Sequence, residues 1–150
     1  MITELNTRTI DLIVIISANL FNLLIVGIML SRPFGYERLE RICGVLSISL
    51  ILPLGVAVAY NIANRREWWS YVLPLVLIAF LLLELLLDYI LQYPFRQTRL
   101  LWPYLLLFYG GAMFMIGYSF LSIEKLGYLT LVTYFLNLLA TWYSYTHVGY

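Results

Sequence analysis

The sequence has very few of the residues on which most catalytic and metal sites depend. It holds one histidine, His147, and one cysteine, Cys43. No disulfide can form within the chain, and a histidine-rich metal cluster or a pair of histidine haem ligands is excluded. The apolar segments hold no histidine, so no set of nucleophile, histidine and acid can form within them. We therefore expect no metal and no cofactor.

Charge is scarce as well. Asp, Glu, Lys and Arg make up 11% of the 150 residues, and the formal net charge is +1. Soluble domains are about one quarter charged. There is no basic patch, so nucleic acid is excluded as a partner. Hydrophobic residues take up 63% of the chain and the mean hydropathy is +0.88. These values predict an integral membrane protein whose main surroundings are a lipid bilayer.

The apolar residues form five runs, each close to the roughly 20 residues that a helix needs to cross a bilayer. They cover about residues 10–30, 42–63, 69–93, 100–121 and 128–145. Backbone groups find no water in hydrocarbon, so each run must be helical if it spans the membrane. Glu124, Lys125 and Gly127 indicate a turn between the last two runs. The prediction is an all-α bundle of five transmembrane helices in one multi-pass domain, residues 1–150.

Basic residues divide almost evenly between the two sides of such a bundle. The side of the N-terminus carries Arg8, Arg65, Arg66 and Lys125. The other side carries Arg32, Arg38, Arg41, Arg96 and Arg99. Positive charge is enriched on the cytoplasmic side, so the small difference favours a N-terminus outside. The compartment we expect is the plasma membrane of a prokaryote.

Two acids interrupt the third run. An ionisable residue near the bilayer centre costs about 2.5–3.5 kcal/mol on insertion scales, and each Leu returns about 0.3–0.6 kcal/mol. Glu84, Asp88, Gln92 and Arg96 follow one another at intervals of four and so share one helical face. One interpretation is a site for a proton, a cation or a polar-headed ligand. In the alternative, Glu84 bonds to a neighbouring helix and Asp88 pairs with Arg96 or Arg99 at the interface.

Other polar residues fall within the apolar runs and could line a shared polar interior. The candidates are Asn19, Asn22, Tyr118, Tyr134 and Asn137. For each of them the alternative is a hydrogen bond between helices that only holds the bundle together. The sequence leaves both interpretations open.

Small residues mark the positions where helices could approach closely. These positions are Gly44, Gly55 and Ala59 in the second run and Gly110 and Gly117 in the fourth. Pro53 predicts a kink in the second run, because proline removes one backbone hydrogen bond and clashes with the preceding turn.

Three functions fit these features. The first is a small transporter or binding protein with an intramembrane carboxylate site at Glu84 for a proton, a cation or a polar-headed lipophile. The chain is too short to form two gates alone, so we expect a homodimer. The second is a non-catalytic subunit of a larger membrane complex. The third, an intramembrane enzyme, is disfavoured because Glu84 and Asp88 share one helix, whereas paired catalytic carboxylates usually come from separate elements.

Overall fold

The computed structural model describes residues 2–149, with side chains from residue 6 onward, and all regular secondary structure in that range is helical. The elements in chain order are α1 (Ile2–Ser31), α2 (Glu37–Ser49), α3 (Ile51–Ala63), α4 (Trp69–Glu84), the π-helical turn η1 (Leu85–Ile90), the 3-10 turn η2 (Phe95–Gln97), α5 (Leu101–Ser122) and α6 (Glu124–Val148). The predicted all-α bundle is therefore confirmed.

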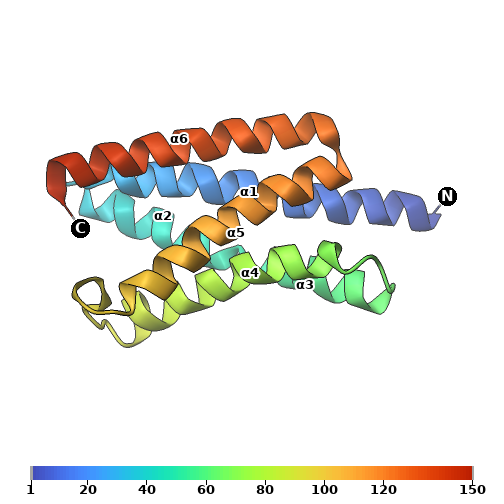
Figure 1. The fold of residues 1–150 in the computed structure, drawn as a ribbon, viewed down its shortest axis with the longest axis horizontal. Helices are drawn as coiled ribbons and strands as arrows, with labels where there is room; N and C mark the ends of the chain where they lie inside the picture. Colours follow the sequence, from blue (N-terminus) through green and yellow to red (C-terminus); the bar gives the residue numbers. More distant parts are fainter. Residues whose placement is uncertain (1, 150) are drawn as a thin grey trace.

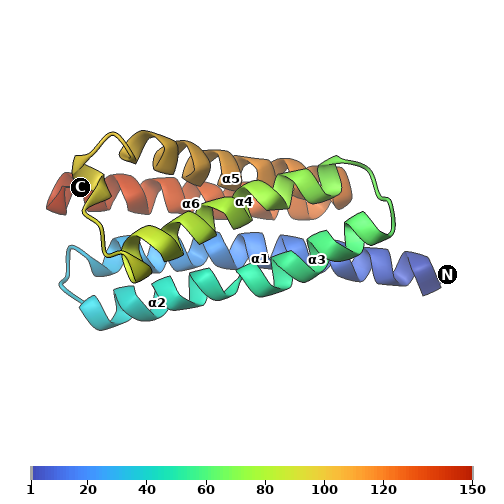
Figure 2. The ribbon, with the colours of Figure 1, turned by 90° about the horizontal axis from the view of Figure 1, so that it is seen from below.

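The helices lie along the long axis of the bundle, except that α5 crosses it obliquely, from α4 at one end to α6 at the other (Figures 1 and 2). α1 packs along α6, and α4 packs along α5 and α3. The centre is an aromatic cluster. The ring of Phe80 lies 5.9 Å from that of Phe21 and 5.3 Å from that of Phe108, and all three side chains are buried. This cluster fills the middle of the bundle with apolar side chains.

The second apolar run is divided into α2 and α3 at Leu50. Pro53 explains the division, because it has no N–H to give to Ser49 and its ring collides with that carbonyl. The backbone tightens there instead, and the amide of Leu50 donates to the carbonyl oxygen of Ser47 at 3.1 Å. The kink predicted from Pro53 is thus present as a break between two helices.

The third run ends earlier than predicted. Its last helical residue is Ile90, whereas the sequence predicts a helix to residue 93. Gln92 has a φ of +46°, in the left-handed region that turns a chain out of a helix, and Pro94 follows. The stripe of polar residues spaced by four therefore stops at Asp88. Gln92 lies in the connection that follows and is exposed.

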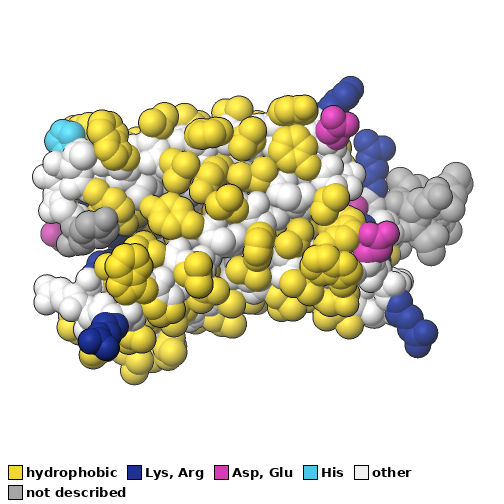
Figure 3. Space-filling view, viewed as in Figure 1, with side chains coloured by type: hydrophobic (Ala, Val, Ile, Leu, Met, Phe, Trp, Pro, Cys, Tyr) yellow, Lys and Arg dark blue, Asp and Glu magenta, His cyan; other side chains and the backbone are white. Residues whose placement is uncertain are grey.

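Four helical segments are long and apolar enough to cross a membrane. They are Asn6–Ser31, Glu37–Ala63, Trp69–Ile90 and Leu101–Ser122. α6 is not among them, although it has 25 residues. In Figure 3, apolar side chains cover the middle of the visible face, and the charged side chains lie towards the two ends. This distribution is compatible with insertion into a bilayer.

Among the small residues that the sequence suggests for close packing, Gly44 makes a close contact, and a further close contact occurs at Gly111. A Cβ added at Gly111 would lie 3.1 Å from the Cα of Leu77, so α5 meets the backbone of α4 there. A Cβ added at Gly44 would collide with the hydroxyl of Tyr89. A Cβ added at Gly55, Gly110 or Gly117 would meet nothing within 4 Å, and Ala59 is exposed. The last four positions face outward from the single chain.

Candidate ligand site at one end of the bundle

Glu84 and Asp88 line a cavity of about 290 Å³ between the start of α2, the end of α1 and η1. Three arginines share its walls, namely Arg32, Arg41 and Arg96. The acids in its walls are Glu37, Glu40, Glu84 and Asp88. The walls thus carry one more formal negative charge than positive, and the acids that the sequence singles out face a polar hollow.

Two of these acids are held in ion pairs. Nη2 of Arg96 donates to Oδ2 of Asp88 at 2.8 Å, and Nε of Arg32 donates to Oε1 of Glu40 at 2.8 Å. Burial alone would lower the pKa of Arg96, but the charges of Asp88 and Glu84 and the hydrogen bond to Asp88 together raise that pKa above its ordinary value. Asp88 therefore pairs with Arg96, one of the two arginines that the sequence offers as its partner. Arg99 is exposed and forms no ion pair in the described part of the chain.

Glu84 differs from both paired acids. The hydroxyl of Tyr104 on α5 donates to its Oε2 at 2.5 Å, and no ion pair of Glu84 occurs among residues 6–149. Tyr104 packs against Phe95 and Phe80, with ring centroids 4.6 and 5.3 Å apart. Phe95 and Phe80 are almost completely buried. The side of Glu84 that meets Tyr104 is therefore backed by close-packed aromatic rings.

The π-helical turn explains why Tyr89 also reaches the cavity. Hydrogen bonds from i to i+5 place more residues in each turn than an α-helix does, so Tyr89 rotates towards the face of Glu84. Its hydroxyl then lies against the backbone of Gly44, which leaves room for it because glycine has no Cβ. Tyr89 and Gly44 both line the cavity. Spacing by four could not reveal this neighbour.

The asparagines join α1 to α6 through a ladder of side-chain hydrogen bonds. Nδ2 of Asn137 donates to Oδ1 of Asn22 at 3.2 Å, and Nδ2 of Asn22 donates to Oγ1 of Thr133 at 3.1 Å. Thr133 donates in turn to Oδ1 of Asn19 at 2.8 Å, and Asn19 donates to Thr130 at 3.0 Å. Asn22 and Asn137 are buried. This is the arrangement of the interhelical alternative, and it lies along the α1–α6 contact, away from Glu84.

Tyr134 and Tyr118 are both buried, but in different surroundings. Tyr134 has the ring of Phe135 as a neighbour, with centroids 6.3 Å apart. The Tyr118 hydroxyl donates to Oδ1 of Asp11 at 2.6 Å, near the other end of the bundle. The five residues that the sequence groups into one polar interior therefore lie in three places. The asparagines form the α1–α6 ladder, Tyr118 contacts Asp11, and Tyr134 lies beside Phe135.

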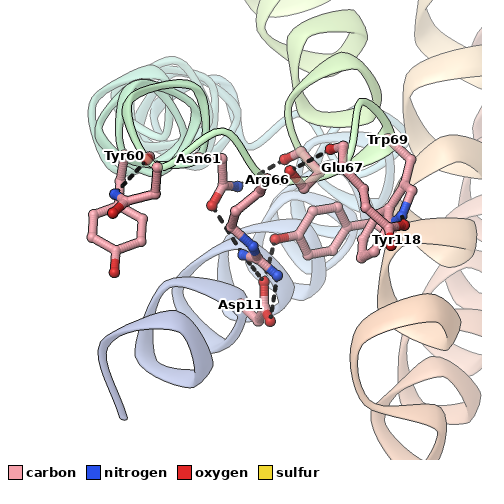
Figure 4. A network of polar contacts seen from close by, with 9 residues as sticks. Asp11, Tyr60, Asn61, Arg66, Glu67, Trp69 and Tyr118 are labelled. Carbon is pink, nitrogen blue, oxygen red and sulfur yellow. Dashed lines mark hydrogen bonds and ion pairs between the residues drawn. The ribbon is translucent and has the colours of Figure 1, made fainter. Parts of the chain in front are cut away.

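The contact of Tyr118 belongs to a network that the sequence reasoning did not foresee (Figure 4). Arg66, in the connection between α3 and α4, donates to both oxygens of Asp11 at 2.7 and 3.2 Å and to Oδ1 of Asn61 at 2.9 Å. Burial alone would lower the pKa of Arg66, but its hydrogen bond and charge contact with Asp11 raise that pKa above its ordinary value. The sequence does place Asp11 and Arg66 near the ends of apolar runs on the same predicted side of the membrane, and this was the only hint of their contact.

Comparison with models of protein families, with curated proteins and with solved structures finds no match for this chain. The function is therefore inferred from the residues of the cavity. Glu84 is central to it because its hydrogen-bond partner, Tyr104, is neutral whereas Asp88 and Glu40 are held by arginines.

Proposed function

We propose that the chain is a multi-pass membrane protein in which α6 forms a fifth crossing. The hydropathy of α6 is lowered by polar residues that face inward, since Thr130, Thr133, Asn137 and Thr141 are all buried. Its outward residues are apolar: Leu129, Val132, Phe135, Leu136 and Leu139 are exposed. Lipid would therefore meet an apolar surface on α6, and the α1–α6 ladder satisfies the polar groups inside.

Within this protein, we propose that the cavity binds a lipophilic ligand with a positively charged head, and that Glu84 is its counter-charge. The observation that carries the proposal is the bonding of Glu84, which forms no ion pair in the described part of the chain, whereas Asp88 and Glu40 are each paired with an arginine. A carboxylate at the end of a membrane bundle is neutralised either by a proton or by a cationic partner. A cationic group entering the cavity would be such a partner.

An open apolar surface beside the cavity supports the lipophilic part of the ligand. It lies along the start of α2, shares Glu37 with the charged cavity, and includes Tyr36, Leu39 and Ile42. These three side chains are exposed. An alkyl chain attached to a cationic head could therefore cover apolar surface beside the charged walls.

The packing favours binding over conduction. A conduction path for ions would have to continue from Glu84 into the bundle. Phe80, Phe108 and Phe21 lie in contact along that route and are buried. The cavity is therefore closed towards the centre of the bundle, and we propose that the protein binds a ligand and does not conduct ions.

The test is native mass spectrometry of the purified protein in neutral detergent, with dodecylamine and dodecanol as matched probes. A hydrogen-bonded charge is worth about 1.5–3 kcal/mol, so wild type should retain dodecylamine about tenfold or more in excess of dodecanol. Glu84→Gln should lose that preference. Glu124→Gln, at an exposed acid that does not line the cavity, should keep it. An unchanged preference in Glu84→Gln would overturn the proposal.

A second candidate is an interaction subunit or homodimer, and the outer face of α3 favours it. Gly55 has open space around it, and Ala59 and Ala63 are exposed on the same ladder of small residues. Such ladders let a second helix approach closely in a membrane. The same mass spectra give the mass of the assembly, and Gly55→Leu should convert a dimer into a monomer if this face is the contact.

A further inference from the structure

Arg32 and Arg96 stand where three adjoining cavities meet. Both line the charged cavity beside Glu84. Both also line a neighbouring cavity of about 360 Å³ that reaches Ser31 and Gly149, and a small one of about 30 Å³ beside Tyr104. These two guanidinium groups are therefore common to all three of these cavities.

Each of the two arginines keeps hydrogen-bonding capacity after its ion pair is formed. A guanidinium group has five N–H donors. Arg32 uses Nε for Glu40 and directs Nη1 towards the sulfur of Met29 at 3.7 Å. Arg96 uses Nη1 and Nη2 for Asp88. Within the described part of the chain, Nη2 of Arg32 and Nε of Arg96 donate to no protein atom.

The cavity also offers charges of both signs that no ion pair takes up. Arg41, like Glu37 and Glu84, lines it and forms no ion pair among the described residues. A simple cation would be complementary to the acids and would leave Arg41 and the remaining donors of Arg32 and Arg96 unused. A ligand with both an ammonium group and an anionic group is complementary to all of them.

The order of these charges along the bundle is informative. Arg32 comes directly after the apolar span that ends at Ser31, and Arg96 lies in the connection after the span that ends at Ile90. Both therefore lie at the depth where lipid headgroups meet a membrane protein. Glu84 is six residues inside the same span, about 9 Å or less along the helix. Arg32 is thus the outermost of the three groups, the guanidinium of Arg96 lies beside Asp88 near the end of the span, and Glu84 is about one helical turn deeper than Asp88.

We infer that the ligand is an amino-alkyl phosphate, with its phosphate bound by Arg32 and Arg96 and its ammonium bound deeper, by Glu84. The inference rests on the proposed function and names the ligand class of the same site. Phosphate suits the site because its tetrahedral oxygens can accept from two planar guanidinium groups at once. In a glycerophospholipid with an amine headgroup the order is reversed, since the amine lies on the water side of the phosphate.

The test uses four probes on the full-length protein by native mass spectrometry in neutral detergent. They are 2-aminododecyl phosphate, 2-aminododecan-1-ol, a lysophosphatidylethanolamine with one twelve-carbon chain, and phosphoethanolamine. Wild type should retain 2-aminododecyl phosphate about tenfold more than the amino alcohol, the difference that one charge-assisted contact gives. It should also retain it more than the lysophospholipid.

A variant that removes both members of an ion pair reduces the risk that the protein misfolds. Arg32→Gln combined with Glu40→Gln removes both members of one ion pair, so that no unpaired charge remains. This double variant should retain 2-aminododecyl phosphate no better than 2-aminododecan-1-ol, and it should still bind dodecylamine. Arg65→Gln, at an exposed arginine that does not line these cavities, should keep both. Retained dodecylamine binding also shows that the double variant is folded.

The outcomes separate the inference from the proposed function. Equal retention of the amino alcohol and its phosphate, with amine binding that still depends on Glu84, would overturn the inference alone. Preference for the lysophospholipid would overturn the order of charges. If wild type retains none of the amines, the proposed function is overturned. Retention of phosphoethanolamine equal to that of the long-chain phosphate would support the amino-phosphate site, assign it to a soluble ligand and overturn the lipophilic part of the proposed function.

Discussion

Asp11 accepts hydrogen bonds from Tyr118 and Arg66 on the same oxygen, Oδ1, at 2.6 and 2.7 Å. One carboxylate on α1 thereby joins α5 and the connection between α3 and α4 (Figure 4). The side chain of Asp11 is 10% exposed and that of Arg66 is 17% exposed. Water can replace little of this network, so its loss should be felt across the whole bundle.

Asp11→Asn should lower the free energy of unfolding by about 3 kcal/mol, because it leaves a largely buried guanidinium without its counter-charge. The measurement is unfolding by sodium dodecyl sulfate in mixed micelles, followed by tryptophan fluorescence. Asp11→Asn combined with Arg66→Gln should recover part of the loss, since no charge is then left unpaired. Glu124→Gln, at an exposed acid, is the control and should change little. Equal stability of Asp11→Asn and wild type would contradict a structural role.

Gly111 and Gly110 are neighbours with opposite expected responses to alanine. At Gly111 the new Cβ would lie 3.1 Å from the Cα of Leu77, so α4 and α5 must separate, at a cost of about 1–3 kcal/mol. At Gly110 nothing lies within 4 Å, and the better helix propensity of alanine should leave stability unchanged or raise it by up to about 1 kcal/mol. The same unfolding titration measures both. A larger loss of stability for Gly110→Ala than for Gly111→Ala would contradict this assignment of the close contact.

Asn137→Leu separates the two interpretations of the α1–α6 ladder. Leucine has a similar size but cannot bond to Asn22 or Thr141, and buried side-chain hydrogen bonds in membrane proteins are worth about 0.6 kcal/mol on average and at most about 1.7 kcal/mol. Stability should therefore fall by about 1–2 kcal/mol. In a double-mutant cycle with Asn22→Leu, the double variant should lose less stability than the two single variants lose in sum, because the two residues share one bond. A more stable Asn137→Leu would instead favour a ligand-binding role, since functional polar groups are often held at a cost in stability.

The positions of the helices were largely readable from the residues. The five apolar runs all became helical, and the turn predicted around Glu124 narrowed to the single residue Ile123 between α5 and α6. The break in the second run lies where Pro53 places it. The end of the third run was missed by three residues, because the apolar run continues past Ile90 while the backbone turns at Gln92.

The site was readable only in part. The acids at residues 84 and 88 do face a cavity, yet their partners come from elsewhere in the chain. Tyr104 is twenty residues from Glu84 and on another helix. The asparagines, which have the same intramembrane character in the sequence, turned out to bond to one another and to threonines across α1 and α6. Residue type alone does not separate a polar group facing a cavity from one facing a neighbouring helix.

By itself, the sequence determined that this protein is apolar enough for a membrane, that it is helical, and which residues share a face wherever the helix is a regular α-helix. These properties depend on run length and on periodicity within one helix, which are local. The tertiary structure alone decided which faces meet. Asp11 and Arg66 are 55 residues apart, and Asn22 and Asn137 are 115 apart. Such contacts depend on how whole helices pack against one another, and no local pattern carries that information.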